Sequence, residues 1–346
     1  MSNLARRQRA HEVEVAVVTL NRNFQSGELL PAREQWQGID VVRVPYWGST
    51  RYPLAPAVLR HLRSSDILHV HAIDFFVDYL AALKRVRLFL KPMVVSTHGG
   101  IFHTDQQLAL KRLFFHSASR LSLKMFDRVV CCSVGDVDTF AQISDNLTLI
   151  ENGIVIRKFG DAEAGVDGAA LLYVGRLSSN KNLTALMAGV DAANAAGIEQ
   201  SLIVVGRSNS GDIESLWSSH RQLRHPERVL LLIDADDATI RRSIRRSRYV
   251  VSASRYEGFG LTVPELMSYG LVPVLNDIPP FRRFVECSAS GLLFDVERQP
   301  LAQAIAALPR GETWRGQSAR ARAYAETLSW EIVQQRFGAL YDALLA

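Results

Sequence analysis

The second half of the chain alternates short apolar segments with longer amphipathic ones, and this alternation limits the possible folds more than any other feature. Strands are expected at 170–174, 202–205, 229–233, 249–253 and 272–275, and helices at 182–196, 212–222, 238–246 and 280–286. Strands that are separated in this way by helices form parallel sheets with helices on both faces. The sequence therefore predicts an α/β fold.

The first half of the chain repeats this alternation. Strands are expected at 11–20, 39–44, 66–71, 93–97, 128–133 and 147–151. A glycine-rich, acidic and aperiodic stretch at 157–168 is interpreted as a linker. Because 346 residues exceed the size of one ordinary core, we expect one domain at 1–156 and a second at 169–329. A last helix, at 330–346, is expected to return to the first domain.

The composition excludes several classes of protein. Hydrophobic residues make up 48% and charged residues 22% of the chain, as in soluble globular domains. No apolar run is long enough to span a bilayer, and the first residues lack the apolar core of a signal peptide. Three cysteines, two of them adjacent, form neither a disulfide framework nor a metal-binding spacing, which favours a reducing cytoplasm.

The net charge of +5 favours partners that carry negative charge, such as phosphates or an anionic membrane face. Nucleic acid is not expected as a partner, because the chain has no zinc-finger spacing and no aromatic RNA-binding signature. A metal site is not expected either. His69 and His71 face the same side of one strand, but no third ligand accompanies them.

Polar side chains end or follow five of the expected strands. They are His71, His98, Asn152, Arg176 and Glu257. The carboxyl ends of parallel strands meet at one edge of a sheet, and ligands of α/β proteins bind at that edge. Their common position therefore indicates a binding site, although each of these residues taken alone is also compatible with an ordinary turn.

The stretch 252–270 combines a strand end, a glycine loop and a helix that is expected to begin at Thr262. A helix start offers free backbone N–H groups to an anion such as phosphate. Glu257 and Glu265 can accept hydrogen bonds from hydroxyl groups. Phosphate and hydroxyl groups together indicate a sugar nucleotide. The alternative is a capping box, in which Thr262 and Glu265 satisfy the backbone donors of the helix start.

A second loop, at 175–181, also follows an expected strand and precedes an expected helix. The guanidinium of Arg176 and the ammonium of Lys181 can both reach a diphosphate across such a turn. The alternative is an exposed loop in which both cations are solvated and bind nothing.

These motifs together resemble those of retaining glycosyltransferases of family 4. The resemblance is carried by 257–261 with Glu265, by 175–176 with Lys181, by 151–154 and by 97–99. Three further stretches, at 45–62, 69–79 and 96–104, are similar to the bacterial exopolysaccharide α-mannosyltransferases of xanthan and acetan assembly. The resemblance implies the GT-B architecture, in which two Rossmann-like domains with parallel sheets face each other across a cleft.

The resemblance also implies a reaction and its participants. Mannose would pass from GDP-mannose to a cellobiose unit on undecaprenyl diphosphate, with retention of the anomeric configuration and without a metal cofactor. Such an acceptor implies peripheral contact with the cytoplasmic face of the inner membrane. The basic and apolar helix expected at 106–126 fits this contact, and a core helix with a basic outer face is the alternative.

Roles for individual residues follow from the resemblance. Those implied as catalytic are His98, Glu257, Arg176 and Lys181, and those implied as donor-binding are Arg176, Lys181, Glu257, Gly258, Phe259, Gly260, Leu261, Glu265 and Asn152. Arg176 and Lys181 would hold the diphosphate of the donor and stabilise the leaving GDP. Glu257 would contact hydroxyl groups of the transferred sugar, and Glu265 would bind the ribose. His98 would contact the donor sugar and the positive charge that develops at its anomeric carbon.

The start of the chain departs from the family pattern. Family members open with a strand, a glycine-bearing loop and a helix, and here the sequence matches from within that helix, at 3–10. The strand and the loop are therefore expected to be missing, which would expose sheet edges and impair transfer. Two alternatives stay open. One is a nucleotide-sugar-binding partner without activity, which the intact Arg176, Lys181 and Glu257 argue against. The other is a family 4 enzyme with another donor, such as UDP-glucose.

Overall fold

The computed structural model describes residues 2–10, 13–24, 26–49, 52–98, 112–207, 213–298 and 301–346. The chain divides into two compact units. Unit 1 comprises Met1–Asn152 and Trp330–Ala346, and unit 2 comprises Gly153–Ser329. The stretch interpreted above as a linker, 157–168, belongs to unit 2, where Ala162 and Ala164 are buried in a hydrophobic core.

In its described residues, unit 1 contains three sheets. In the first sheet, β1 (Ala16–Leu20) is parallel to β3 (Ile39–Val44), which pairs in the antiparallel direction with β2 (Arg33–Trp36). The second is a short antiparallel pair of β4 (Trp47–Ser49) and β5 (Tyr52–Leu54). The third is parallel, with the order β6 (Leu68–His71), β7 (Met93–Ser96), β8 (Arg128–Cys131) and β9 (Leu147–Leu149).

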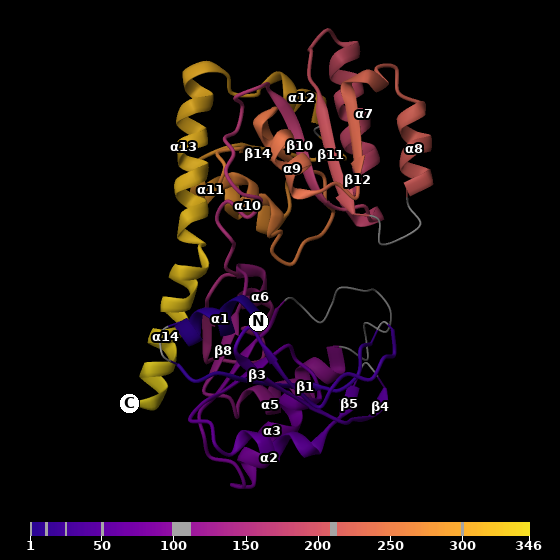
Figure 1. Cartoon of the computed structure of the whole chain (residues 1–346). Coiled ribbons are helices and arrows are strands. Elements are labelled where there is room, and N and C mark those ends of the chain that lie inside the picture. The colour runs from indigo at the N-terminus through magenta and orange to yellow at the C-terminus, as the bar shows by residue number, and fades with distance from the viewer. Residues whose placement is uncertain are drawn as a thin grey trace. The chain divides into compact units, whose positions relative to one another are not determined.

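Helices cover both faces of the four-stranded sheet of unit 1. The helical elements described in this unit are α1 (Ser2–Ala10), η1 (Pro56–Val58), α2 (Leu59–Leu62), α3 (Phe75–Arg85), η2 (Phe115–Ser119), α5 (Arg120–Leu123), α6 (Val134–Phe140) and α14 (Trp330–Leu345). Because side chains alternate between the faces of a strand, Val94 and Val130 pack against α1 and α14. Val95 and Val129 pack on the opposite face, with α3 and α5. Figure 1 shows α1 next to α14, with which it is in contact.

Unit 2 is built on a parallel sheet, which has six strands among the described residues. In spatial order they are β12 (Val229–Ile233), β11 (Leu202–Arg207), β10 (Ala170–Arg176), β13 (Ser247–Ser252), β14 (Val272–Asn276) and β15 (Leu292–Phe294). The chain moves outward from β10 to β12 and then returns to place β13 on the other side of β10. This reversal makes the junction of β10 and β13 the switch point of the sheet, where ligands bind in α/β folds.

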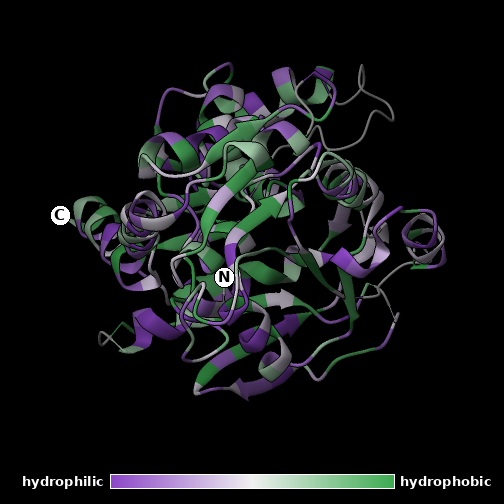
Figure 2. Cartoon of the chain, turned by 90° about the horizontal axis from the view of Figure 1, so that it is seen from above, coloured by the Kyte–Doolittle hydropathy of each residue, from purple (hydrophilic) through white to green (hydrophobic). Residues whose placement is uncertain are grey.

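Helices also cover both faces of the sheet of unit 2 (Figure 1). One face packs against α9 (Asp237–Arg245), α10 (Thr262–Met267), α11 (Pro279–Ser288) and α13 (Gly311–Thr327), and the other against α7 (Leu183–Ala195), α8 (Ile213–Arg221) and α12 (Leu301–Ala306). Within β10, Leu172 belongs to the first of these cores, and Leu171 and Tyr173 belong to the second. Figure 2 shows strands that are mainly hydrophobic and helices that carry both kinds of residue.

The predicted α/β fold is therefore confirmed. The helix predicted at 106–126 lies partly outside the described residues, and its described part consists of 112–114, η2 and α5. A π-helical turn, η2, interrupts that part. None of the helices in the described portion of the chain combines the length and the apolarity that a membrane span requires.

Candidate active site

The carboxyl ends of β10 and β13 carry an ion pair. Lys181 ends the short helical turn η3 (Ser179–Lys181), and its Nζ lies 2.5 Å from Oε1 of Glu257, which follows β13. The hydroxyl of Ser254 donates a second hydrogen bond, of 2.8 Å, to the same oxygen. The side chains of Lys181 and Glu257 are only 11% and 17% exposed, so solvent screens their attraction little.

Two contacts join the loops that hold this pair. The backbone N–H of Arg255 donates to the carbonyl oxygen of Asn180 over 2.9 Å. Nδ2 of Asn276, at the end of β14, donates to the carbonyl oxygen of Ser254 over 3.0 Å. The loop after β13 is thereby fixed to the loop after β10 on one side and to β14 on the other. The sheet itself positions the ion pair.

Arginines end two neighbouring strands at the same edge of the sheet. Arg176 is the last residue of β10, and it is in register with Arg207, the last residue of β11. Both arginines are exposed. The hydroxyl of Tyr173 donates to the carbonyl oxygen of Arg176 over 2.8 Å. Burial and the nearby Glu257 raise the pKa of Tyr173, so the phenol remains a donor. Two guanidinium groups on adjacent strand ends suit an anion such as a diphosphate.

The glycine loop before α10 combines a constrained position with an open one. Gly260 has a φ of +84°, and a Cβ at this position would lie 2.8 Å from Cε1 of Phe281. A Cβ at Gly258 would meet no atom within 4 Å. Phe259 is buried between them and packs edge-to-face on Phe284, with ring centroids 5.3 Å apart. The loop is thus anchored at 259–260 and leaves space for a ligand at Gly258.

Glu265 does not cap α10. The N-cap residue is the exposed Leu261, and no side chain supplies a cap there. Both carboxylate oxygens of Glu265 instead lie 3.0 Å from Nζ of Lys158. The capping-box interpretation is therefore wrong. Burial raises the pKa of Glu265, and the charge of Lys158 opposes this shift. Each carboxylate oxygen still has a lone pair that can accept a hydroxyl hydrogen bond.

His98 lies just beyond β7, at the carboxyl edge of the four-stranded sheet of unit 1, beside two further histidines. Its Nε2 lies 2.7 Å from Nδ1 of His71. The ring of His71 stacks on that of His69, with centroids 4.1 Å apart. The two ring nitrogens of His69 lie 2.7 Å from the hydroxyl oxygens of Tyr341 and Ser96. The position of the His98 ring therefore depends on a chain of contacts that reaches the last helix.

Burial lowers the pKa of His69 to about 3. Desolvation also lowers the pKa of His71, and it lowers that of His98, whose side chain is exposed at its outer edge. The thiol of Cys132, whose Sγ lies 3.6 Å from Nδ1 of His98, stays protonated because burial raises its pKa to about 11. His98 also has a φ of +50°, a left-handed conformation that few residues other than glycine adopt. A neutral imidazole does not repel a positive charge that develops nearby.

Comparison with known proteins assigns the family. The model of Glycosyltransferase Family 4 matches residues 1–158, and that of Glycosyl transferases group 1 matches residues 157–327. A GDP-mannose:cellobiosyl-diphosphopolyprenol alpha-mannosyltransferase of Xanthomonas oryzae is 37% identical to this chain. The match covers 99% of this chain and 92% of the length of that relative. A protein of the same name from Komagataeibacter xylinus is 35% identical, and the match covers 99% of this chain and 88% of the length of that relative. The chain is a glycosyltransferase of family 4.

The transferase has the GT-B fold, as its motifs predicted. Among solved structures, the sucrose-phosphate synthase of Thermosynechococcus elongatus matches it with a TM-score of 0.73. The match covers 99% of this chain and 91% of the synthase, at 19% sequence identity. At this level of identity the likeness concerns the fold alone.

The predicted site residues of the transferase fall into two groups. His98 and Asn152 lie in unit 1, where Asn152 is half-buried, and the others lie in unit 2. Of the residues in unit 2, the structure brings Lys181 and Glu257 into direct contact.

Four residues that lie beside the predicted site residues were not predicted, namely Lys158, Asn180, Arg207 and Ser254. Lys158 lies in the stretch interpreted as a linker, where no motif marks it. Arg207 could have been predicted from the sequence, because it follows the expected strand at 202–205 in the same way as Arg176 follows the strand at 170–174.

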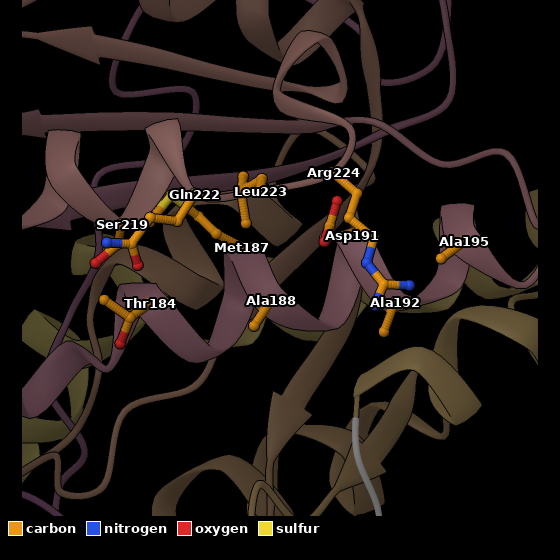
Figure 3. Close-up of a pocket in the computed structure, with 10 residues that line it drawn as sticks. All are labelled: Thr184, Met187, Ala188, Asp191, Ala192, Ala195, Ser219, Gln222, Leu223 and Arg224. Carbon is orange, nitrogen blue, oxygen red and sulfur yellow. The ribbon is translucent and has the colours of Figure 1, made fainter.

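A hollow of about 480 Å³ lies elsewhere in unit 2 of the transferase, between α7 and α8 (Figure 3). Its lining residues are Thr184, Met187, Ala188, Asp191, Ala192, Ala195, Ser219, Gln222, Leu223 and Arg224. Three of them are alanines on successive turns of α7, and Oδ1 of Asp191 accepts the backbone N–H of His225 over 2.7 Å. None of the predicted site residues lines this hollow.

Proposed function

We propose that the transferase moves mannose from GDP-mannose to a polyprenyl-diphosphate-linked oligosaccharide of the cellobiose type during exopolysaccharide synthesis. The names of relatives that are 35–37% identical over nearly the whole chain support this donor and this acceptor. The acceptor hydroxyl attacks the anomeric carbon from the side that GDP leaves. The bond between that carbon and the diphosphate oxygen breaks, and a phosphate oxygen takes the hydroxyl proton. The configuration is therefore retained.

The Lys181–Glu257 pair is the observation that carries the proposal. The ammonium of Lys181 lies next to the carboxylate of Glu257 at the switch point of unit 2. We assign the ammonium to the leaving diphosphate and the carboxylate to hydroxyl groups of the sugar. Arg176 ends the adjacent strand and adds a guanidinium fork. Charge on a departing group is stabilised best by groups that are already in place. We assign the neutralisation of the diphosphate to these two cations, and we propose that the reaction needs no metal ion.

The remaining predicted roles belong to the same proposal. Glu265 is a buried carboxylate that binds the ribose hydroxyl groups, and the backbone at 258–261 donates to sugar and phosphate oxygens. His98 contacts the donor sugar as a neutral imidazole, in keeping with its lowered pKa. Asn152 belongs to the donor-binding set. These assignments follow the resemblance to the family, and the hydrogen-bonding groups of these residues are compatible with them.

Transfer of radiolabelled mannose from GDP-mannose to cellobiosyl diphosphopolyprenol tests the proposal directly. The purified chain is expected to form an α-linked, lipid-borne trisaccharide, and to do so in the presence of EDTA. Product with UDP-glucose and none with GDP-mannose would assign a different donor. Stabilisation by GDP in a thermal melt, without product from any donor, would assign nucleotide-sugar binding without transfer.

Lys181→Ala is expected to lower kcat/KM by about 10²–10³-fold, because it removes a charge that faces the departing diphosphate. Glu257 is the ion-pair partner of Lys181. The substitution Glu257→Gln keeps the shape of this side chain but removes its charge, and it is expected to lower kcat/KM as well. The matched control is Arg221→Ala, which breaks the exposed pair with Glu214 and is expected to transfer mannose at the wild-type rate. Wild-type kcat/KM in a folded Lys181→Ala protein would contradict the assigned role.

We propose further that the transferase works at the cytoplasmic face of the inner membrane. A polyprenyl diphosphate is held in the bilayer, whereas GDP-mannose is dissolved in water. The enzyme therefore has to meet both at the membrane surface, through a peripheral contact.

A further inference from the structure

We propose that Lys158 is a positioning residue of the donor site, which fixes the carboxylate of Glu265 for the two neighbouring hydroxyl groups of the donor's ribose. The inference rests on the proposed function and deepens it, because it assigns a part in nucleotide recognition to a residue that none of the motifs marks. Lys158 lies in the stretch 157–168, which belongs to unit 2 together with Glu265.

The ammonium of Lys158 is shared between both oxygens of one carboxylate. Its Nζ lies 3.0 Å from Oε1 and 3.0 Å from Oε2 of Glu265. An ionised carboxylate accepts about four hydrogen bonds, two on each oxygen. The ammonium uses one lone pair on each oxygen, so one on each remains. Two neighbouring hydroxyl groups match these remaining lone pairs, and a ribose carries such a pair at C2′ and C3′.

The two side chains differ in exposure in the way that a supporting cation requires. The side chain of Glu265 is 8% exposed, whereas that of Lys158 is 45% exposed. The carboxylate is therefore shielded from water, while the ammonium keeps part of its hydration. Because a buried carboxylate is costly without a partner of opposite charge, a half-exposed lysine supplies the missing charge at a small desolvation cost of its own.

Hydrogen bonds on both sides of this lysine tie its backbone to the turn that ends α10. The backbone N–H of Arg157 donates to the hydroxyl oxygen of Ser268 over 3.1 Å, and this hydroxyl donates to the carbonyl oxygen of Glu265 over 2.6 Å. The backbone N–H of Phe159 donates to the hydroxyl oxygen of Tyr269 over 2.6 Å. The lysine is thus anchored next to the carboxylate, unlike a surface ion pair whose two long side chains meet only at their tips.

Lys158 favours the ionised form of Glu265. Burial raises the pKa of Glu265, and the charge of Lys158 opposes this rise. The phenol of Tyr269, four positions further along, interacts with this carboxylate and with the guanidinium groups of Arg157 and Arg241. Burial raises the pKa of Tyr269 to about 12, and arginines stay charged, so none of these three groups titrates near neutral pH. A charged acceptor forms hydrogen bonds about twice as strong as a neutral one.

Isothermal titration calorimetry of the full chain with GDP tests the role of Lys158. Lys158→Met keeps the length of the side chain but removes its charge. It is expected to weaken GDP binding about tenfold at pH 7, because the carboxylate loses its partner and its fixed orientation. Lys158→Arg keeps the charge and is expected to bind GDP within about threefold of the wild type. UDP contains the same ribose and serves as a second probe.

Two comparisons separate positioning through Glu265 from a direct contact between Lys158 and the nucleotide. In the Glu265→Gln background, Lys158→Met is expected to cause no further loss, because no carboxylate is left to position. With 2′-deoxy-GDP, which lacks one of the two hydroxyl groups, Lys158→Met is expected to cause a smaller loss than with GDP. Equal losses in both backgrounds would assign Lys158 to the diphosphate and would overturn the inference.

The pH dependence of binding is a readout that a purely structural role of Lys158 would not change. Without the lysine the pKa of Glu265 rises further, so the carboxylate loses its charge as the pH falls. The affinity of the wild type relative to Lys158→Met is therefore expected to grow by about threefold or more from pH 8 to pH 6. The phosphates of GDP titrate in both proteins and cancel in this ratio. A constant ratio would contradict the inference.

The matched control is Arg245→Gln, which removes a cation of unit 2 from an exposed pair with Asp167 and is expected to bind GDP like the wild type. Melting temperatures establish that the variants fold, and Lys158→Gln is measured beside Lys158→Met as a second neutral variant. Tighter binding of GDP to either neutral variant would show that the lysine occupies the place of the ribose, and this result would also overturn the inference.

Steady-state kinetics with GDP-mannose separates this inference from the proposed function. The ribose is remote from the bond that breaks, so Lys158→Met is expected to raise KM about tenfold and to change kcat by less than about threefold. A loss confined to kcat would overturn the positioning role. If the wild type transfers no mannose, the proposed function fails, and the binding of GDP and UDP still decides the role of Lys158. Binding of neither nucleotide would overturn both.

Discussion

At the scale of single residues, removal from water decides which groups of the candidate site carry charge. Lys181 and Glu257 are largely buried and lie within ion-pair distance of each other. Glu265 is buried against Lys158. The imidazole of His69, in contrast, is bonded to two hydroxyl groups and stays neutral. A charge is costly to bury unless a partner of opposite sign accompanies it.

The state of His69 predicts that acid destabilises unit 1. Its pKa is about 3 in the folded chain and about 6.5 in an unfolded one. Between these values the unfolded chain binds a proton that the folded chain does not. His69 alone therefore lowers the free energy of unfolding by about 1.4 kcal/mol per pH unit as the pH falls through this window. Denaturant unfolding at a series of pH values measures the slope.

His69→Gln is expected to reduce this slope, because the variant lacks the titrating group. Ser96→Ala removes one hydrogen-bond partner of His69 but keeps the imidazole, so it is expected to retain the slope. A slope in His69→Gln as steep as that of the wild type would show that His69 is not responsible.

At the scale of elements, the two glycines in the loop between β13 and α10 have different structural roles. Gly260 is required by its positive φ and by the close approach of Phe281. Gly258 has neither constraint, and the space beside it is open. One glycine therefore shapes the loop, and the other leaves room for a ligand.

Gly260→Ala is expected to lower the free energy of unfolding by about 1–3 kcal/mol, because alanine adopts a positive φ poorly and its Cβ would crowd Phe281. Thermal or denaturant unfolding measures the loss. The matched control, Gly258→Ala, is expected to change the free energy of unfolding by less than about 1 kcal/mol. Equal losses in the two variants would mean that the packing against Phe281 does not matter.

Most elements were predictable from the pattern of apolar residues, and the exceptions have a physical cause. The strands expected at 93–97 and 229–233 correspond to β7 and β12. The pair of β4 and β5 was not predicted, because each strand has only three residues. The central residue is Gly48 in β4 and Pro53 in β5, and both residue types are rare in strands. Tertiary contacts support β5, where the hydroxyl of Tyr52 donates to Asp78 over 2.7 Å.

At the scale of the whole molecule, the last helix completes unit 1. α14 follows unit 2 in the sequence but packs with unit 1. Its residues Val333 and Phe337 share a core with Val94 and Val130 of the four-stranded sheet. The hydroxyl of Tyr341 on the same helix bonds to His69. The histidine cluster therefore depends on a segment that is far from it in the sequence.

Phe337→Ala is expected to lower the free energy of unfolding of unit 1 by about 3–5 kcal/mol, because it leaves a cavity between α14 and the sheet. Denaturant unfolding with a probe in unit 1 measures this loss. Leu345→Ala, at an exposed position of the same helix, is the control and is expected to change stability by about 0.5 kcal/mol or less. A loss in Phe337→Ala no larger than that of the control would place α14 outside the core.

The sequence by itself determined the fold class, the family and most of the residues at the strand ends. These depend on periodicity and on short motifs, which are local properties of the chain. Only the tertiary structure decided that Lys181 pairs with Glu257, 76 positions away, and that Lys158 pairs with Glu265, 107 positions away. It also decided that the imidazole of His69 is buried and neutral. Desolvation and ion pairing act through space, so they depend on neighbours that only folding supplies.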